Sequence, residues 1–186
     1  MVDEKIIELY WKRDETAIQE TAQKYEKYLI KIAYNILNDT EDSRESVNDT
    51  YLKAWHNMPP NKPNVLKTFL AKITRQISID IIRTRTRKKR SSTQYELSLY
   101  ELEECIADGN NTQQEVELKL LGKLINDFLY SLPELSRNIF VCRYYFCDSI
   151  KDISAYFAIS ESKVKSTLYR TRLSLKEHLE SEGFFV

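Results

Sequence analysis

Basic side chains gather in one short stretch of a chain whose formal net charge is zero. Residues 61–90 carry ten basic and one acidic side chain, and the stretch ends in the run RTRTRKKR at 83–90. Neutralising the phosphates of a nucleic acid requires positive charge at such local density. A solvated helix face or a basic linker explains the same count, so charge alone leaves both interpretations open.

A second candidate binding set lies in the segment ESKVKSTLYRTRLSL, which starts at Glu161. Basic and hydroxyl side chains at its outward helical positions can bond phosphates and base edges in a major groove. They are Ser162, Lys163, Lys165, Ser166, Thr167, Tyr169, Arg170 and Arg172. The apolar residues Val164, Leu168 and Leu175 would then face a core. A helical hairpin with a solvated basic face is the alternative.

No set of residues points to catalysis or to a bound metal. The sequence holds no Gly-rich phosphate loop, no nucleophile with a base nearby, and no metal-ligand spacing among its Cys and His. We therefore predict a protein that is not an enzyme and that carries no cofactor or metal. Three cysteines without a CxxC pair predict reduced thiols, and no apolar run approaches the ~20 residues of a membrane span, so we expect a cytoplasmic protein.

The elements that must position these residues are helices. Only three Gly and four Pro occur in 186 residues, and apolar residues recur at steps of three and four. The predicted helices cover residues 3–37, 40–58, 65–89, 115–131, 135–146, 149–157 and 160–179. A Pro-rich loop at 59–64 interrupts them. Asp39 or Thr40 and Ser160 are suited to cap the helices that follow them. The prediction is an all-α protein.

Two of the predicted helices have one core face and one polar face. In helix 40–58 the predicted core stripe is Val47, Tyr51, Leu52 and Trp55. In helix 65–89 the predicted core stripe is Leu66, Leu70, Ile73, Ile77 and Ile81, and the polar side is Lys72, Arg75, Gln76 and Arg83. The second stripe leaves the basic side chains of residues 61–90 turned to solvent.

Charge also divides the chain into parts. Residues 91–120 carry seven acidic and one basic side chain, directly after the basic stretch. We interpret residues 91–114 as a flexible acidic linker between two small helical domains, 1–90 and 115–186.

Four segments resemble the sigma-70 family, especially its small extracytoplasmic-function type. SLPELSRNIF at 131–140 and SIKDISAYFAISESKVKSTLYRTRLSL at 149–175 resemble region 4, which contains a helix-turn-helix. DSRESVNDTYLKAW at 42–55 resembles region 2.2, and FLAKITRQISID at 69–80 resembles regions 2.3 and 2.4. The resemblance implies an RNA polymerase sigma factor that binds core polymerase and directs promoter-specific initiation, with region 2 in residues 1–90 and region 4 in 115–186.

The resemblance also implies which residues bind which partner. Region 2.2 would dock on the clamp helices of the largest polymerase subunit through Asp42, Glu45, Asn48 and Asp49. The loop Asn57–Asn64, which contains Asn61 and Lys62, would capture a flipped base of the −10 element. Lys67, Lys72, Arg75, Gln76 and Arg83 would hold the melted strand or the duplex edge. Region 4 would read the −35 element through Ser162, Lys163, Lys165, Ser166, Thr167, Tyr169 and Arg170.

Further partners follow from the same resemblance. Region 4 would contact the flap of the second large polymerase subunit, and the acidic linker would thread the RNA-exit path. A cognate, membrane-anchored anti-sigma factor is implied as well. The sequence departs from the family pattern at Phe69 (usually Trp), at Asn48 and Asp49 (Gln-Glu), at Ser154 (Ala) and at Ala158 (a turn Gly).

Two other functions stay open on the residues alone. One is a helix-turn-helix repressor or activator that binds palindromic duplex without polymerase. The other is a helical adaptor that uses its charged faces for protein contacts. The order of acidic helix, Pro-rich loop and basic helix favours the sigma interpretation, because neither alternative requires it.

Overall fold

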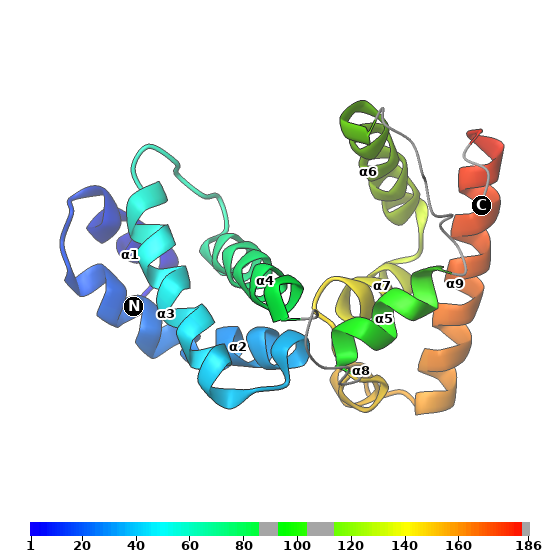
Figure 1. The fold of residues 1–186 in the computed structure, drawn as a ribbon, viewed down its shortest axis with the longest axis horizontal. Coiled ribbons are helices and arrows are strands. Elements are labelled where there is room, and N and C mark those ends of the chain that lie inside the picture. Colours follow the sequence, from blue (N-terminus) through cyan, green and yellow to red (C-terminus); the bar gives the residue numbers. More distant parts are fainter. Residues whose placement is uncertain (86–92, 104–113, 184–186) are drawn as a thin grey trace. The chain divides into compact units, whose positions relative to one another are not determined.

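A computed structural model describes residues 1–85, 93–103 and 114–183, without the side chains at 85, 103 and 114–118. The described residues form helices α1 (Asp3–Trp11), α2 (Thr16–Leu37), α3 (Thr40–Asn57), α4 (Leu66–Arg85), α5 (Gln94–Glu103), α6 (Gln114–Ser131), α7 (Glu134–Tyr144), α8 (Ile150–Phe157) and α9 (Glu161–Ser181). No strand occurs among them, which confirms the predicted all-α class. The chain divides into two compact units, Met1–Tyr95 and Glu96–Val186 (Figure 1).

Unit 1 is built from α1 to α4, with α2, α3 and α4 packed side by side (Figure 1). Its apolar core takes one face of each helix, and Tyr10, Leu29, Leu66 and Leu70 are completely buried in it. Full burial of such a side chain contributes about 1.5–3 kcal/mol. Asp39 caps α3 as predicted, because its carboxylate accepts the backbone N–H groups of Glu41 and Asp42.

The prediction of one helix over 3–37 is wrong, since α1 and α2 are separate helices. Arg13 adopts a left-handed conformation (φ 57°), and the Asp14 carboxylate accepts the Thr16 backbone N–H at 3.0 Å. The turn folds α1 back so that Tyr10 shares a buried hydrogen bond of 2.9 Å with Thr21. Both helices bury one face in the same core, so their apolar periodicity continues across the break.

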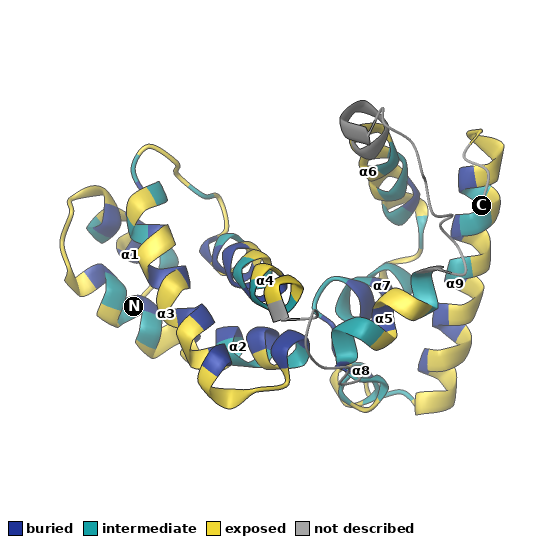
Figure 2. Cartoon of the chain, viewed as in Figure 1, coloured by how far each residue is buried: buried dark blue, intermediate teal, exposed yellow. Residues whose placement is uncertain are grey.

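Unit 2 is built around α7, α8 and α9, with α6 against α9. Its core includes the completely or almost completely buried Ile139, Ile153, Val164, Leu168 and Leu175. Figure 2 shows the result on α9, where buried and exposed positions alternate along the helix.

A helix lies within the segment predicted to be a flexible linker. Residues 94–103 of the predicted 91–114 linker form α5, and Ser98 and Leu102 of this helix turn inward. Cys105 and residues 104–113 of the predicted linker lie outside the described residues.

Candidate nucleic-acid interface

Helices α8 and α9 form a capped helix-turn-helix in unit 2. The Ser149 hydroxyl accepts the backbone N–H of Asp152 at 3.1 Å, and the Ser160 hydroxyl accepts that of Lys163 at 3.2 Å. Between the helices, Ala158 takes a left-handed conformation with φ 51°. The Ser154 hydroxyl donates to the carbonyl of Ile159 at 2.5 Å, which ties α8 to the turn. The start of α9 is thus fixed by hydrogen bonds on both sides.

The exposed face of α9 carries most of the predicted basic and hydroxyl set. Ser162, Lys163, Lys165, Ser166, Tyr169 and Arg170 are all exposed. Within this face the Arg170 Nε donates to the backbone carbonyl of Ser166 at 3.2 Å, so the guanidinium lies along the helix surface. Ser166 itself donates to the carbonyl of Lys163 at 3.0 Å.

Two residues that the sequence placed on this face point elsewhere. Thr167 is only 6% exposed, because it stands beside the buried Leu168 on the inner half of the helix. Arg172 donates from Nη1 to the Tyr144 hydroxyl at 2.8 Å and lies 3.6 Å from the Glu101 carboxylate. Both belong to the packing of unit 2, and the outward orientation predicted for them is wrong.

In unit 1 a polar face runs along α4, opposite its buried stripe. Lys72, Gln76 and Arg83 are exposed, and Arg75 is half-buried. The Lys67 ammonium lies 4.6 Å from the ring centroid of Tyr28 on α2, which adds an aromatic ring beside the basic side chains. The Gln76 amide donates to Asp80 at 3.0 Å. Of the predicted core stripe, Leu66, Leu70 and Ile73 are buried, and Ile77 and Ile81 are half-buried.

The loop between α3 and α4 adds two exposed polar residues. Asn61 and Lys62 are both exposed, and the Asn61 amide donates to the carbonyl of Asn57 at the end of α3. Of the run RTRTRKKR, Arg83 is described with its side chain, whereas residues 86–90 lie outside the described residues.

Helix α3 presents a separate, acidic face. Glu45, Asn48 and Asp49 are exposed at helical spacing, as predicted, but Asp42 is only 8% exposed and belongs to the packed side. Leu52, predicted to be in the core, is 55% exposed. It follows Asn48 by four residues and Asp49 by three, and this spacing puts it on the acidic face. The spacing was the signal that could have identified it.

Four buried hydroxyl side chains join α3 to α4. The hydroxyls of Ser46 and Ser78 lie 2.9 Å apart, as do those of Thr50 and Thr74, and all four residues are completely buried. Side chains this small let the two helices approach closely. The acidic face of α3 and the basic face of α4 are thereby fixed relative to each other.

Comparison with known protein families identifies the two units that carry these faces. A family model described as sigma-70 region 2 matches residues 21–88, which include most of α2 and all of α3 and α4. A model described as sigma-70, region 4 matches residues 123–175, which include α7, α8 and most of α9. The chain belongs to the sigma-70 family. Its relatives are of the extracytoplasmic-function type, as the sequence resemblance indicated.

Two sigma factors of that type are similar over most of this chain. The ECF RNA polymerase sigma factor SigW of Bacillus subtilis is 23% identical over 188 residues, covering 96% of this chain and 97% of the relative. The ECF RNA polymerase sigma factor SigE of Mycolicibacterium smegmatis is 22% identical over 164 residues, covering 86% of this chain and 60% of the relative. The protein is therefore an RNA polymerase sigma factor, a transcription initiation factor whose family binds core polymerase and promoter DNA.

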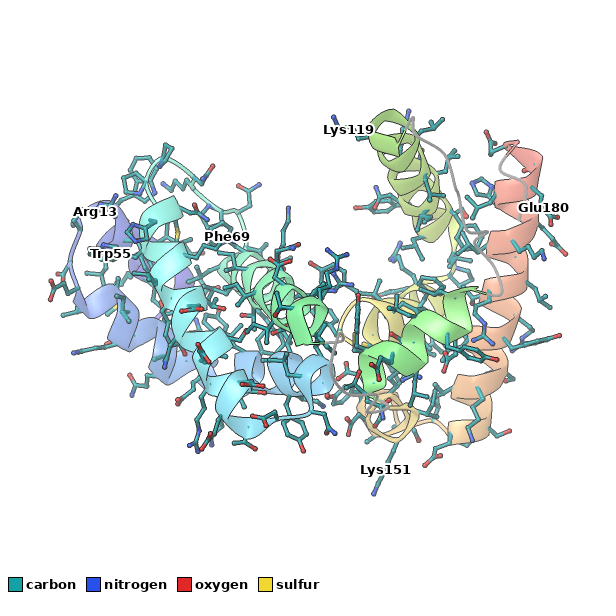
Figure 3. All side chains as sticks on the ribbon, in the orientation of Figure 1. Arg13, Trp55, Phe69, Lys119, Lys151 and Glu180 are labelled. Atoms are coloured by element: carbon teal, nitrogen blue, oxygen red, sulfur yellow. The ribbon has the colours of Figure 1, made fainter. Side chains whose placement is uncertain are left out.

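Trp55 of this sigma factor, at the end of α3, is a core anchor rather than a surface group. It is half-buried against the unit 1 core, and its ring lies 6.1 Å from that of Tyr10. The Arg13 guanidinium covers the ring at 5.2 Å and donates to the Trp55 carbonyl at 2.6 Å (Figure 3). Phe69, at the position where the family usually has Trp, is half-buried against the same core.

Within the described ranges, no three His, Cys, Asp or Glu side chains are grouped so that they could hold a metal ion. Cys142 is half-buried and Cys147 is buried in the packed part of unit 2. In the same ranges, each helix is too short or too polar to cross a membrane.

Proposed function

We propose that this sigma factor docks on core RNA polymerase through α3, opens and holds the −10 element with α4 and the preceding loop, and reads the −35 element with α9. The observation that carries the proposal is the exposed basic and hydroxyl face of α9, on a helix whose opposite side is buried and whose start is fixed by caps. Such a helix can enter a major groove without rearranging.

The −35 element would be read by the exposed residues of the predicted set. These are Ser162, Lys163, Lys165, Ser166, Tyr169 and Arg170, and the proposal no longer includes Thr167. Each base or phosphate contact of this kind contributes about 1–3 kcal/mol. Lys165→Ala or Arg170→Ala should therefore reduce initiation from a −35-dependent promoter about fivefold or more.

The −10 element would be held by the polar face of unit 1. Its members are Asn61, Lys62, Lys67, Lys72, Arg75, Gln76 and Arg83. Unstacking DNA costs a few kcal/mol per step, so phosphate contacts and a captured base must compensate for it. Arg75→Ala should impair promoter opening more than initial binding, because the melted strand forms only in the later step.

Core polymerase would bind the acidic face of α3 through Glu45, Asn48 and Asp49, with the exposed Leu52 as an apolar contact among them. Asp49→Lys should weaken binding to core polymerase about tenfold, since it reverses a charge at the centre of this face. Glu8→Lys on α1 makes the same charge change at an exposed position outside the face and is the matched control.

The decisive experiment is transcription in vitro from a genomic fragment library, with core polymerase and with or without the protein. New transcripts that share −35 and −10 elements support the proposal. Permanganate footprints and run-off assays on those promoters then compare Arg75→Ala with Arg170→Ala, with Lys151→Ala as a charge-matched control on α8. Equal defects of both variants at both steps contradict the assigned roles. Protein-only protection of duplex sites, without transcripts, indicates a conventional helix-turn-helix regulator.

A cognate anti-sigma factor, anchored in the membrane, is also part of the proposal. The exposed α3 face offers such an inhibitor a surface whose occupation would exclude polymerase. An inhibitor of this kind must compete with core polymerase for the protein, and Asp49→Lys must weaken both complexes if they share the α3 face. Both partners and the promoter place the proposed activity in the cytoplasm.

A further inference from the structure

One carboxylate on α5 accepts hydrogen bonds from two side chains of unit 2. Glu101 Oε1 accepts from Nη2 of Arg143 at 2.6 Å. Its Oε2 accepts from Nε of Arg143 at 3.3 Å and from the Tyr144 hydroxyl at 2.9 Å. Arg172 Nη1 lies 3.6 Å from the same oxygen. Hydrogen bonds between charged partners are the strong ones among side chains.

The side chains that contact Glu101 come from α7 and α9, and a backbone carbonyl in the loop after α7 also bonds one of them. Arg143 is 3% exposed and donates from Nη1 to the Asp148 carbonyl at 3.1 Å. Arg172 donates to the Tyr144 hydroxyl at 2.8 Å, and that hydroxyl donates onward to Glu101. Burial, together with the charge of Glu101, raises the pKa of Tyr144, so this phenol stays a donor. Arg143, Tyr144 and Arg172 are thus held by hydrogen bonds that do not involve α5.

The apolar packing of α5 against unit 2 is incomplete. Ser98 is buried, and its hydroxyl lies 4.0 Å from the Cys147 sulfur. Leu102 borders an apolar cavity of about 360 Å³ between α5, α6, α7 and α9. On the outer side of the helix, Leu97 and Tyr100 are 43% and 69% exposed. Since unfilled space forfeits packing energy, the bonds of Glu101 add to an attachment whose apolar packing is incomplete.

We propose that Glu101 is a releasable latch, and that the latch sets the length of chain that tethers the two DNA-binding units. This inference rests on the proposed function for its role at promoters. With α5 attached to unit 2, only residues 86–93 connect α4 to the attached helix. Eight residues span at most about 30 Å, whatever their conformation.

When α5 is released, the first helix that remains packed in unit 2 is α6. Residues 86–113 then connect the two units. Even if α5 remains helical, this longer tether reaches about 80 Å. The gain of about 50 Å corresponds to about fifteen base pairs at 3.4 Å per base pair. The latch therefore limits how far apart two DNA elements can be when both units bind at once, and its release removes the limit.

The test uses the full chain with Glu101→Gln, which keeps the shape of the side chain but removes its charge. Asp127→Asn, at an exposed position of α6, is the control with the same chemical change. Hydrogen–deuterium exchange should become at least tenfold faster in the amides of α5 and stay unchanged in α8 and α9. Small-angle X-ray scattering should show a maximum dimension at least about 20 Å greater than in the control.

Either of two exchange results overturns the latch. If the exchange of α5 is unchanged, Glu101 does not hold the helix. If α8 and α9 accelerate equally, α5 is an integral part of the fold of unit 2. An unchanged maximum dimension in a variant with rapid α5 exchange overturns the tether.

None of these measurements needs DNA or polymerase, so they are independent of the proposed function. For the promoter role, transcription is compared on templates whose two elements are progressively further apart. Glu101→Gln should tolerate longer spacing than the control, and an unaltered spacing preference contradicts that role even where the latch itself is supported.

Discussion

The two units join their helices by different chemistry. In unit 1, α3 and α4 are joined by neutral hydroxyls, Ser46 with Ser78 and Thr50 with Thr74, all completely buried. In unit 2, α5 is joined to α7 and α9 by charged groups around Glu101, whose side chain is 28% exposed. Neutral, buried pairs hold a register that salt does not change, whereas partly exposed charges can exchange protein partners for water. The difference suggests a fixed α3–α4 interface and a reversible α5 interface.

The largest expected effect comes from placing leucine at each interface. Ser46→Leu forces a large side chain between α3 and α4 and should destabilise unit 1 by about 3 kcal/mol. Glu101→Leu should change the stability of unit 2 by less than about 1 kcal/mol, because the released α5 exposes Arg143 to water.

Fluorescence can separate the two units in these variants. Both tryptophans, Trp11 and Trp55, lie in unit 1, so denaturation followed by fluorescence reports that unit, while circular dichroism reports both. Lys53→Leu, at an exposed position of α3, controls for added hydrophobicity. Equal losses of stability for Ser46→Leu and Glu101→Leu would remove the distinction between the interfaces.

The next effect compares two buried tyrosines. Among the described residues the Tyr51 hydroxyl has no hydrogen-bond partner, whereas the Tyr144 hydroxyl bonds both Glu101 and Arg172. Tyr144→Phe should destabilise unit 2 by about 1–2 kcal/mol. Tyr51→Phe should leave unit 1 unchanged or raise its stability by up to about 1 kcal/mol, because it removes an unpaired polar group. Denaturation at pH 7 measures both.

Tyr51 also predicts a pH dependence. Burial raises the pKa of Tyr51 to about 12 from its ordinary value of 10. The folded state favours the neutral phenol, so the stability from this group is complete below pH 10 and is lost as the pH rises toward 12. The loss is up to about 1.4 kcal/mol per pH unit, and about 2 kcal/mol between pH 10 and pH 12. Tyr51→Phe should lose less stability than the wild type between pH 10 and 12. Parallel pH profiles contradict this.

Much of the fold was accessible from local sequence signals. The cap at Asp39, the cap at Ser160 and the apolar stripes of α4 and α9 each depend on residues within a few positions of one another. The exposed members of the α9 face follow from the same periodicity. Interactions within one helix leave a pattern that can be read without the rest of the chain.

The errors come from pairings between distant segments. Ser46 and Thr50 look like surface residues of α3 until partners 32 and 24 positions away bury them. Because Ser46 and Thr50 lie on the packed side of α3, Leu52 lies on the side that faces solvent. In unit 2, Arg172 was assigned to the DNA face because Glu101, its partner, lies in a segment whose acidic composition indicated a linker. Residue type alone therefore misassigns a helix face where a polar side chain is bonded to a partner far away in the sequence.

A smaller effect tests whether the hydroxyl pairs act as pairs. The Thr50 hydroxyl also lies 2.8 Å from the Ser46 carbonyl, and the Thr74 hydroxyl lies 3.1 Å from the Leu70 carbonyl. Because each hydroxyl has one proton, one of the two donates across the interface and the other donates to its own helix. Thr50→Val leaves the buried Thr74 hydroxyl without its partner on α3 and should destabilise unit 1 by about 1 kcal/mol. Adding Thr74→Val should recover most of that loss, because both partners are then apolar and of similar shape. A double-mutant cycle by tryptophan fluorescence measures the coupling. Additive losses show two independent hydroxyls.

The smallest effect compares how a helix ends in each unit. Asn38 caps the C-terminus of α2 (φ 50°) and Ala158 caps that of α8 (φ 51°), and both are left-handed. Asparagine tolerates this conformation through local hydrogen bonding, whereas alanine is strained by about 1 kcal/mol. Ala158→Gly should therefore stabilise unit 2 by up to about 1 kcal/mol, and Asn38→Gly should change unit 1 by only a few tenths of a kcal/mol.

The same comparison bears on DNA binding. Ala158 lies between the two helices that present α9, and the Ser154–Ile159 hydrogen bond also closes this turn. If that bond fixes the geometry, Ala158→Gly changes stability but leaves initiation from a −35-dependent promoter unaltered. Weaker initiation from a more stable Ala158→Gly variant would mean that the strained alanine, rather than the serine hydroxyl, holds α9 in its reading position, and Ser154→Ala should then leave initiation intact.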